Sequence, residues 1–402
     1  MTAVCIFDGI RTPFGRHGGV LAKIRADDLL ATVIKTLIER NGIDGSLIED
    51  VIVGDTNQAG EDARNVARNA LLLAGLPTIV AGQTINRLCG SGAAAIMSAA
   101  QALRSGEGKL FLAGGVENMS RSPWVIAKAE SAWSRSQPMF DSTIGWRFPN
   151  PNLLKDFGDE SMAQTADNIA GDLNISREDS DRFAHTSQKK YAGAKAAGFY
   201  IDEILPLETP GTRKQDPVVT VNEDEHPRPD STLEKLATLK PLNAAGVVTA
   251  GNASGINDGA AMLLIGSEEF GKKLGLKPRA RIRACAVAGV EPRVMGLGPV
   301  PASQKALQRA GLELRDMDVL ELNEAFATQV LGCLKQLGLP FDDERINPNG
   351  GAIAIGHPLG ASGARLVLTA MRQLERIKGN YGLATMCIGI GQGIAIIIER
   401  VE

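Results

Sequence analysis

The chain has 402 residues, a formal net charge of −3 and 44% hydrophobic residues. This length exceeds the size at which one hydrophobic core usually stops growing, so we expect two or three domains. A slightly negative charge offers no overall attraction to nucleic acid or to an anionic membrane, so a polyanionic ligand must meet a local basic patch. No apolar run approaches the ~20 residues that cross a bilayer. The composition argues against a nucleic-acid-binding or membrane protein.

The five cysteines are few, odd in number and scattered, which fits a reducing compartment better than a disulfide framework. They are Cys5, Cys89, Cys285, Cys333 and Cys387. No Cys-x-x-Cys pair occurs, and the four scattered histidines offer no metal-ligand spacing. Residues 4–7 have the pattern of a strand and lack the long apolar region of a signal peptide. We therefore expect a cytoplasmic protein without a bound metal.

The predicted elements occur twice along the chain, in the same order. Each half has a short apolar strand, a glycine turn that opens a helix of small residues, a strand that ends in glycine, and a closing apolar strand. In the first half these elements are residues 50–55, 89–97, 110–115 and 261–265. In the second half they are residues 318–324, 357–368, 383–389 and 394–398. Alternating strands and helices indicate α/β layers, with the small-residue helices buried between the two halves.

Residues 120–248 fit neither half. They are richer in Pro, Ser, Asp and Glu, and they include one clear helical pattern at 162–170. We interpret this stretch as an insertion that covers a ligand site. The predicted division is an N-terminal half at 1–119 and 249–270, an inserted loop domain at 120–248, and a C-terminal half at 271–402.

Three reactive side chains lie in glycine-rich turns: Cys89, His357 and Cys387. Glycine beside a thiol or an imidazole lets the backbone turn sharply and lets a ligand approach main-chain N–H groups. A buried structural cysteine needs no such turn, because it behaves as a small apolar group. Two thiols and one imidazole presented in this way predict an enzyme in which one thiol is the nucleophile and the other groups move protons.

At these residues the sequence resembles the thiolase family, and the resemblance runs from end to end. The family's motifs occur in its order, at residues 86–92 (NRLCGSG), 114–120, 251–255, 323–327 (NEAFA), 350–363 and 386–393. A single glycine-rich motif would be weak evidence, whereas the ordered set is specific.

The resemblance implies an α/β, thiolase-like fold. In this fold two duplicated βαβαβαββ halves stack as five layers (αβαβα), with a loop domain inserted in the first half. This agrees with the repeat found independently above. The resemblance also implies a homotetramer or homodimer, no permanently bound cofactor, and coenzyme A as a substrate.

The resemblance implies a role for each reactive residue. Cys89 is expected to become acylated, and Cys387 to move the proton of the substrate α-carbon. His357, with a water held by Asn323, is expected to stabilise the enolate oxygen, and the backbone N–H groups of Cys89 and Gly389 form a second oxyanion hole. A thiol with a pKa near ~8.5 needs a helix N-terminus or an imidazole to ionise at neutral pH, and both are expected beside Cys89. Asn323 has the alternative of capping a helix.

The resemblance also implies contacts with the substrate and its coenzyme A moiety. Arg228 matches the arginine near the adenine and phosphates, although a solvated loop charge is an equal alternative. The other matching positions are Ala250, Ser254, Met162, Ala325 and Phe326. Ser161 departs from the histidine that acetoacetyl-CoA thiolases often carry before this methionine, which argues against that subgroup.

A closer resemblance is to the 3-oxoadipyl-CoA thiolases of aromatic-compound degradation, at residues 143–148, 228–234 and 292–301. It implies cleavage of 3-oxoadipyl-CoA with CoA to succinyl-CoA and acetyl-CoA. Because that substrate ends in a carboxylate, we hypothesise that Arg147 recognises it through a charge-assisted hydrogen bond. A salt bridge within the insertion or at a subunit contact is an equal alternative for Arg147.

Several other functions remain open at this point. The alternatives within the family are an acetoacetyl-CoA thiolase and a general fatty-acid 3-ketoacyl-CoA thiolase. A decarboxylating ketoacyl synthase is disfavoured by Cys387, and a non-catalytic thiolase-like binding protein by the intact set of reactive residues. Ser362 does not lie in a Gly-x-Ser-x-Gly elbow, so we predict a packing role for it. We expect His17, His185 and His226 to be solvated.

Overall fold

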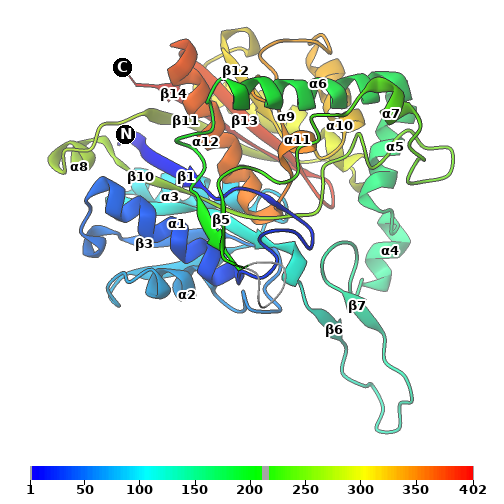
Figure 1. Ribbon diagram of the computed structural model, residues 1–402, viewed down its shortest axis with the longest axis horizontal. Coiled ribbons are helices and arrows are strands. Elements are labelled where there is room, and N and C mark those ends of the chain that lie inside the picture. The colour runs from blue at the N-terminus through cyan, green and yellow to red at the C-terminus, as the bar shows by residue number, and fades with distance from the viewer. Residues whose placement is uncertain (1, 211–216, 402) are drawn as a thin grey trace.

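In the computed structural model, which describes residues 2–210 and 217–401, the largest sheet has ten strands (Figure 1). The first half contains β1 (Val4–Arg11), β2 (Gly15–Arg16), α1 (Ala26–Asn41), β3 (Asp50–Gly54), α2 (Val66–Leu73), β4 (Ala81–Ile85), α3 (Ser91–Ser105), β5 (Leu110–Asn118) and β10 (Asn257–Ser267). The second half contains α8 (Glu268–Lys273), β11 (Ala280–Gly289), a 3₁₀ helix η3 (Pro292–Leu297), α9 (Pro299–Ala310), β12 (Val319–Leu322), α10 (Ala327–Leu337), α11 (Ala352–Ile355), α12 (Leu359–Ile377), β13 (Tyr381–Ile388) and β14 (Gln392–Arg400).

The two halves use the same strand order. It is β1-β10-β5-β3-β4 in the first half and β11-β14-β13-β12 in the second. At the position of a fifth strand in the second half, Leu320 forms an isolated parallel bridge with Ile346. The halves join where β1 pairs with β11 at Cys5 and Ile6. The predicted repeat of elements is therefore confirmed, with one strand reduced to a bridge.

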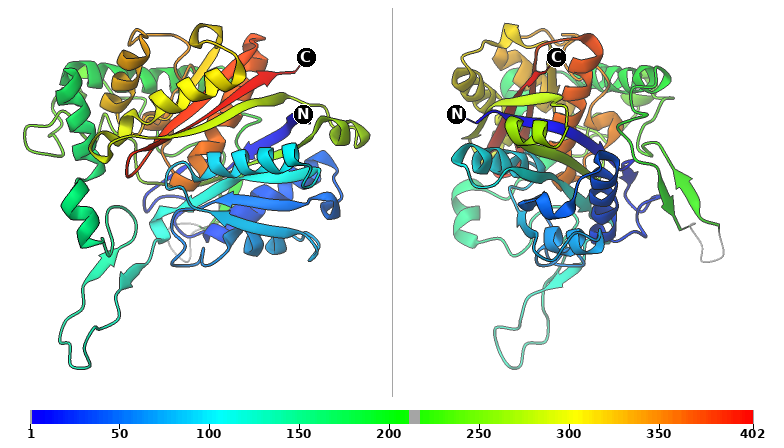
Figure 2. Two further views of the ribbon diagram at one scale, coloured as in Figure 1. Left: turned by 180° about the vertical axis from the view of Figure 1, so that it is seen from behind. Right: turned by 90° about the vertical axis from the view of Figure 1, so that its left-hand side faces the viewer.

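The helices and strands form five layers (Figure 2). Helices α3 and α12 pack on each other and on strands of both halves, since α3 contacts β3, β5 and β14 while α12 contacts β5, β10, β12 and β13. One outer layer is formed by α1 and α2 on the first half, and the other by α9 with α10 on the second. The buried core accordingly divides into a central cluster around α3 and α12 and one cluster on each outer side.

The two central helices approach each other at glycine. A Cβ at Gly92 of α3 would lie 2.4 Å from the carbonyl oxygen of Gly360 in α12, and a Cβ at Gly363 would lie 2.3 Å from the backbone nitrogen of Ala93. Real Cβ atoms essentially never approach backbone this closely, so only glycine permits the contact. The N-terminal turns of α3 and α12 therefore touch, and each turn begins two residues after a reactive side chain, Cys89 or His357.

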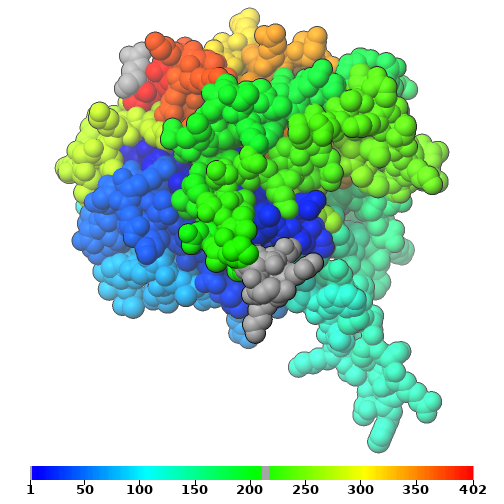
Figure 3. All heavy atoms as spheres, viewed as in Figure 1, coloured from blue at the N-terminus to red at the C-terminus, as the bar shows by residue number. Residues whose placement is uncertain are grey.

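The inserted stretch contains β6 (Trp124–Ile126), β7 (Met139–Asp141), α4 (Pro151–Phe157), α5 (Met162–Leu173), α6 (Arg177–Ala196), β8 (Leu207–Thr209), β9 (Val219–Val221) and α7 (Leu233–Ala237). The hairpin of β6 and β7 projects from the body as an arm (Figures 1 and 3). The predicted helix at 162–170 is α5, which begins at a capping box formed by Ser161 and Gln164.

A buried ion cluster connects the insertion to the first half. Arg11 of β1 donates to Glu203 (2.6 Å) and forms two hydrogen bonds with Asp224 (2.6 and 3.0 Å), and all three side chains are fully buried or nearly so. Removing one partner of such a group leaves an uncompensated buried charge, which is strongly destabilising. The insertion is therefore fixed to the sheet. Among the described residues, no helix combines the length and apolarity that a membrane crossing requires.

Candidate active site

Cys89 lies in a tight turn between β4 and α3. Leu88 has a left-handed backbone conformation (φ 46°), and its N–H donates to the Asn86 side chain (2.9 Å). The Ser91 hydroxyl accepts from the Arg87 N–H (2.9 Å) and donates to the Leu88 carbonyl (2.6 Å). These local hydrogen bonds fix the backbone of the turn and with it the direction in which the Cys89 side chain points.

The second thiol and Gly389 lie beside Cys89. The backbone N–H groups of Gly389 and of Cys89 itself both face the Cys89 sulfur. The two thiols are close enough for Cys89 to affect the pKa of Cys387. Gly90 packs against the Ile388 side chain, because a Cβ at this glycine would lie 2.6 Å from Ile388 Cδ1. The turns at 86–92 and 386–393 are therefore in direct contact.

Burial determines the protonation state of both thiols. It raises the pKa of Cys89 to about 11, although the two backbone N–H groups lower it, and the charge of Glu117 raises it further. The pKa of Cys387 is raised well above its ordinary value by burial and then by Cys89. The expectation that a helix N-terminus or an imidazole makes Cys89 a thiolate is therefore wrong for the unliganded site, because desolvation of the anion outweighs those effects.

His357 is neutral and has a defined tautomer. Burial lowers its pKa to about 3, and the buried cation Arg365 lowers it further. Ser362 donates its single hydroxyl proton in a hydrogen bond to the Pro358 carbonyl (2.8 Å). Its oxygen can therefore only accept from His357, so the proton on the imidazole is at Nδ1 and donates to Ser362 Oγ (2.6 Å). His357 Nε2 therefore carries the lone pair, and the Asn323 amide donates to it (3.3 Å). The imidazole is arranged to accept a proton.

Three of the predicted substrate-binding residues surround Cys387. Met162, Ala325 and Phe326 belong to one apolar cluster with Cys387 and Met295. These residues come from α5, the loop before α10, β13 and η3. The cluster forms an apolar wall beside the second thiol.

The predicted coenzyme A contacts extend outward from this wall. The Ser254 N–H donates to the Ala325 carbonyl (2.9 Å), so this residue adjoins the cluster. Ala250 and Arg228 are exposed, and the backbone N–H of Arg228 donates to the Gln188 side chain (2.9 Å). Ser254 is therefore next to the apolar wall, whereas Ala250 and Arg228 lie at the surface.

Arg147 does not adjoin the thiols directly. Its guanidinium donates to the Ser142 carbonyl (2.9 Å), and its charge lowers the pKa of Asp62 against the dominant effect of burial. Its neighbour Trp146 lines a small cavity of about 20 Å³ together with Met162 and Ile390. Arg147 is therefore one residue away from the apolar end of the site.

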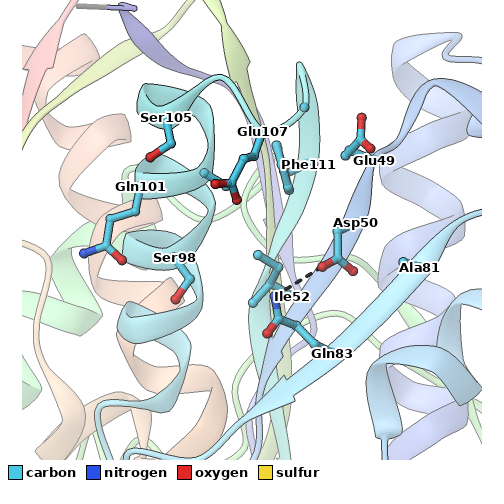
Figure 4. A pocket seen from close by; sticks show the side chains of 12 residues that line it. Glu49, Asp50, Ile52, Ala81, Gln83, Ser98, Gln101, Ser105, Glu107 and Phe111 are labelled. Carbon is cyan, nitrogen blue, oxygen red and sulfur yellow. Dashed lines mark hydrogen bonds between the residues drawn. The ribbon is translucent and has the colours of Figure 1, made fainter.

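A larger cavity of about 600 Å³ lies elsewhere, between α3 and strands β3 and β4 (Figure 4). Its walls carry Asp50 and Gln83 on one side and Ser98, Gln101 and Ser105 of α3 on the other. None of the predicted site residues lines it. The half-buried Cys89 thiol lies instead beside the buried Cys387, where the turns at 86–92 and 386–393 are in contact.

Sequence reasoning missed two contacts of the site. The sequence predicts only a packing role for Ser362. In the structure its hydroxyl, five residues after His357, accepts the Nδ1–H hydrogen bond that fixes the tautomer of the imidazole. Met295 contacts the apolar wall; it lies in the segment 292–301 that carries the closer resemblance, which assigned it no role. The prediction of a solvated His226 is wrong, since burial lowers its pKa to about 4. Within the described ranges, no group of three His, Cys, Asp or Glu residues is arranged to hold a metal ion.

Comparison with known proteins identifies the family. The family described as "Thiolase, N-terminal domain" matches residues 4–269, and "Thiolase, C-terminal domain" matches residues 276–400. The chain belongs to the thiolase family. The thiolase fold and enzyme class that the sequence predicts are thus confirmed.

Two curated thiolases are similar over the whole length. A 3-oxoadipyl-CoA/3-oxo-5,6-dehydrosuberyl-CoA thiolase of Escherichia coli (strain K12) is 59% identical, with 100% of both chains covered. A beta-ketoadipyl-CoA thiolase of Pseudomonas aeruginosa (strain PAO1) is 58% identical over 99% of both chains. Among solved structures, the acetyl-CoA acetyltransferase of Bacillus anthracis matches this thiolase with a TM-score of 0.92 and 39% identity, covering 100% of this chain and 99% of that one.

The tautomer of His357 gives a first prediction. Ser362→Ala removes the acceptor of Nδ1–H, so the imidazole loses its fixed orientation and kcat for thiolysis falls by about 10-fold or more, with KM for CoA unchanged. The matched control is Ser180→Ala in α6, where a buried serine makes the same type of hydrogen bond to the carbonyl four residues earlier (2.9 Å). Equal kcat values in the two variants would contradict the role of Ser362.

The raised pKa of Cys89 gives a second prediction. A thiol with a pKa of about 11 is neutral at lower pH, and its thiolate fraction grows about tenfold per pH unit until that value. The rate of alkylation of Cys89 by iodoacetamide in the unliganded enzyme therefore keeps rising above pH 9. Mass spectrometry of the peptide containing Cys89 measures the rate; a plateau near pH 7 contradicts the prediction.

Proposed function

We propose that this thiolase cleaves 3-oxoadipyl-CoA with CoA to give succinyl-CoA and acetyl-CoA, through an acyl group held on Cys89. The proposal is supported by two neighbouring thiols, by two backbone N–H groups that face the Cys89 sulfur, and by a neutral His357 whose helix α12 touches the helix that follows Cys89. The two full-length relatives at 59% and 58% identity support the choice of substrate.

In the first step the Cys89 sulfur attacks the 3-oxo carbon while its proton passes to His357 Nε2, which releases the Asn323 amide as it takes the proton. The neutral state of both groups makes this transfer necessary, because neither carries a charge in the unliganded site. The negative charge that develops on the former keto oxygen is placed to accept from the N–H groups of Cys89 and Gly389. The transfer also converts His357 into a cation with two N–H donors.

In the second step the bond between C2 and C3 breaks, and its electron pair forms the enolate of acetyl-CoA. The new Nε2–H of His357 donates to the enolate oxygen, and the buried Asn323 Oδ1, which has no protein partner, is available to hold a water beside it. The neutral Cys387 thiol donates its proton to C2, which its raised pKa permits. After acetyl-CoA leaves, CoA gives its thiol proton to the Cys387 thiolate and its sulfur attacks the acyl carbon on Cys89. The bond between that carbon and the Cys89 sulfur then breaks, Cys89 takes back the proton held by His357, and succinyl-CoA leaves.

The same geometry supports contacts with the coenzyme A moiety and with the acyl group of the substrate. We propose that the exposed Arg228 meets the phosphates of CoA, that Ala250 and Ser254 flank the pantetheine, and that Met162, Ala325 and Phe326 contact the reacting carbons. No permanently bound cofactor is required by these steps, and coenzyme A acts as substrate. We also retain the proposal that Arg147 recognises the terminal carboxylate, which requires its guanidinium to turn from Ser142 toward Trp146.

We propose further that the chain acts as a homodimer or homotetramer in the cytoplasm. The arm supports assembly, because it exposes Trp133 at 92%, Trp124 at 65% and Ile126 at 61% of their surfaces. Contiguous exposed apolar side chains of this kind mark protein–protein contacts. The open edge of β4 offers a second surface for a copy of the chain.

The substrate is tested by side-by-side thiolysis of 3-oxoadipyl-CoA, acetoacetyl-CoA and a medium-chain 3-ketoacyl-CoA. We expect kcat/KM for 3-oxoadipyl-CoA to exceed the other two by about tenfold or more. Mass spectrometry is expected to detect a succinyl group on Cys89 when CoA is omitted, and no such adduct with Cys89→Ser. A higher kcat/KM for either other substrate favours the alternative thiolase, and binding of CoA without acylation favours a non-catalytic binding protein.

Arg147 is tested on two substrates in the same enzyme. Arg147→Ala is expected to lower kcat/KM for 3-oxoadipyl-CoA by about 10- to 100-fold, the worth of a hydrogen bond to a charged group. Cleavage of acetoacetyl-CoA, which has no terminal carboxylate, is expected to change little. Equal losses on both substrates would assign Arg147 to folding of the insertion.

A further inference from the structure

A buried carboxylate in the motif at residues 114–120, to which the resemblance assigned no role, is linked to both halves of the site. Glu117 lies near the end of β5, and 1% of its surface is exposed. Its two oxygens accept three hydrogen bonds, from the Gly360 N–H (2.9 Å), the Thr56 N–H (3.2 Å) and the Thr56 hydroxyl (2.8 Å). Its donors thus come from two segments far apart in the sequence.

The first link leads to the histidine. Gly360 belongs to the first turn of α12, three residues after His357. The first four N–H groups of a helix have no partner within the helix, and the residue before α12 is Pro358, which provides no side-chain cap. Glu117 therefore supplies a cap from another strand, and its negative charge complements the positive end of the helix.

The second link leads to the nucleophile. The carbonyl of Thr56 accepts from the Asn86 side-chain amide (3.0 Å), and the Asn86 oxygen accepts from the Leu88 N–H (2.9 Å). Leu88 is the residue before Cys89 and has the left-handed conformation that defines the turn. A continuous chain of hydrogen bonds therefore runs from Glu117 through Thr56 and Asn86 to the cysteine turn.

The charge of Glu117 also reaches the site. Burial raises the pKa of Glu117 to about 7, and Asp62 raises it further, while Thr56 and Gly360 lower it by hydrogen bonding. Asp55 is buried beside it, and its pKa is raised by burial and by Glu117, against the lowering effect of the Asn57 and Thr56 backbone N–H groups. The anion of Glu117 in turn raises the pKa of Cys89.

We propose that Glu117 is a positioning residue for the thiolase reaction, which holds the turn of Cys89 and the turn of His357 at their working separation. This inference rests on the proposed function, because the separation matters only if a proton passes between the two residues. A misplacement of about 1 Å can cost a reaction about 10²-fold in rate, so a fixed link between the turns is valuable.

Glutamine at position 117 separates position from charge. Its carbonyl oxygen can take the place of the oxygen that faces the two N–H groups, and its amide can donate to the Thr56 hydroxyl, which is able to accept. Glu117→Gln therefore keeps the links, whereas Glu117→Ala removes all of them. We expect Glu117→Ala to lower kcat for thiolysis by about 10-fold or more with KM for CoA unchanged, and Glu117→Gln to restore most of the loss.

The pH dependence of Cys89 alkylation provides a second measurement. It would not change if Glu117 had only a structural role. Above pH 7, where Glu117 is ionised, Glu117→Gln removes a charge that raises the pKa of Cys89. Alkylation of Cys89 by iodoacetamide, followed by mass spectrometry, is therefore expected to shift to lower pH than in the wild-type enzyme. An unchanged profile overturns the electrostatic contact between Glu117 and the nucleophile.

Two further comparisons make the result decisive. Wild-type kcat in Glu117→Ala, or equal losses in Glu117→Ala and Glu117→Gln, overturns the positioning role. If Glu117→Ala does not fold, Thr56→Val and Thr56→Ser are compared instead. Valine has the shape of threonine but lacks the hydroxyl donor to Glu117, so kcat is expected to fall several-fold, whereas serine keeps the hydroxyl and is expected to keep kcat. Equal kcat values in these two variants overturn the proposal. A wild-type enzyme that never acylates Cys89 refutes the proposed function instead, so the two failures are distinguishable.

Discussion

The backbone contact between α3 and α12 is the constraint on which the site depends. Gly92 meets the carbonyl of Gly360, and Gly363 meets the backbone of Ala93, at distances that exclude any Cβ. Helix axes normally stay 8–10 Å apart because side chains separate them, and glycine removes that separation locally. Because each helix begins just after a reactive residue, this contact brings the turn of Cys89 and the turn of His357 together across the interface of the two halves.

Close packing of this kind also excludes water, which decides the electrostatics. Burial leaves Cys89, Cys387 and His357 uncharged in the unliganded enzyme, although a helix begins two residues after Cys89 and another two residues after His357. Helix ends contribute modestly, whereas removing an ion from water costs several kcal/mol. In the proposed mechanism, charge therefore appears only when the Cys89 sulfur attacks the substrate carbon. The His357 cation and the substrate oxyanion then form in the same step, beside the N–H groups that stabilise the oxyanion.

Much of the fold could be read from the sequence, because apolar strands and glycine turns are local signals. The repeat, the strand ends and the helix at α5 were all predictable from residue patterns. The sequence also predicted a set of residues for the site, but it could not predict the protonation of their side chains. The state of Cys89 depends on burial by segments from the whole chain, and the cap from Glu117 to Gly360 joins residues 243 positions apart. The hydrogen bond of Ser362 depends on helix geometry that no motif specifies.

The duplicated fold explains why the two halves contribute different chemistry at equivalent positions. Cys89 and His357 each lie two residues before a central helix, so the repeat presents the proposed nucleophile from one half and the proposed base from the other. Neither half alone could place both, since each contributes one central helix. A relative displacement of the halves would separate sulfur from imidazole without altering either turn. The interface therefore needs a polar link as well as apolar packing. Dispersion contacts between apolar groups have little directionality, whereas a buried hydrogen bond fixes the position of one half relative to the other. Glu117, which extends from one half to cap the helix of the other, has the position that such a link requires.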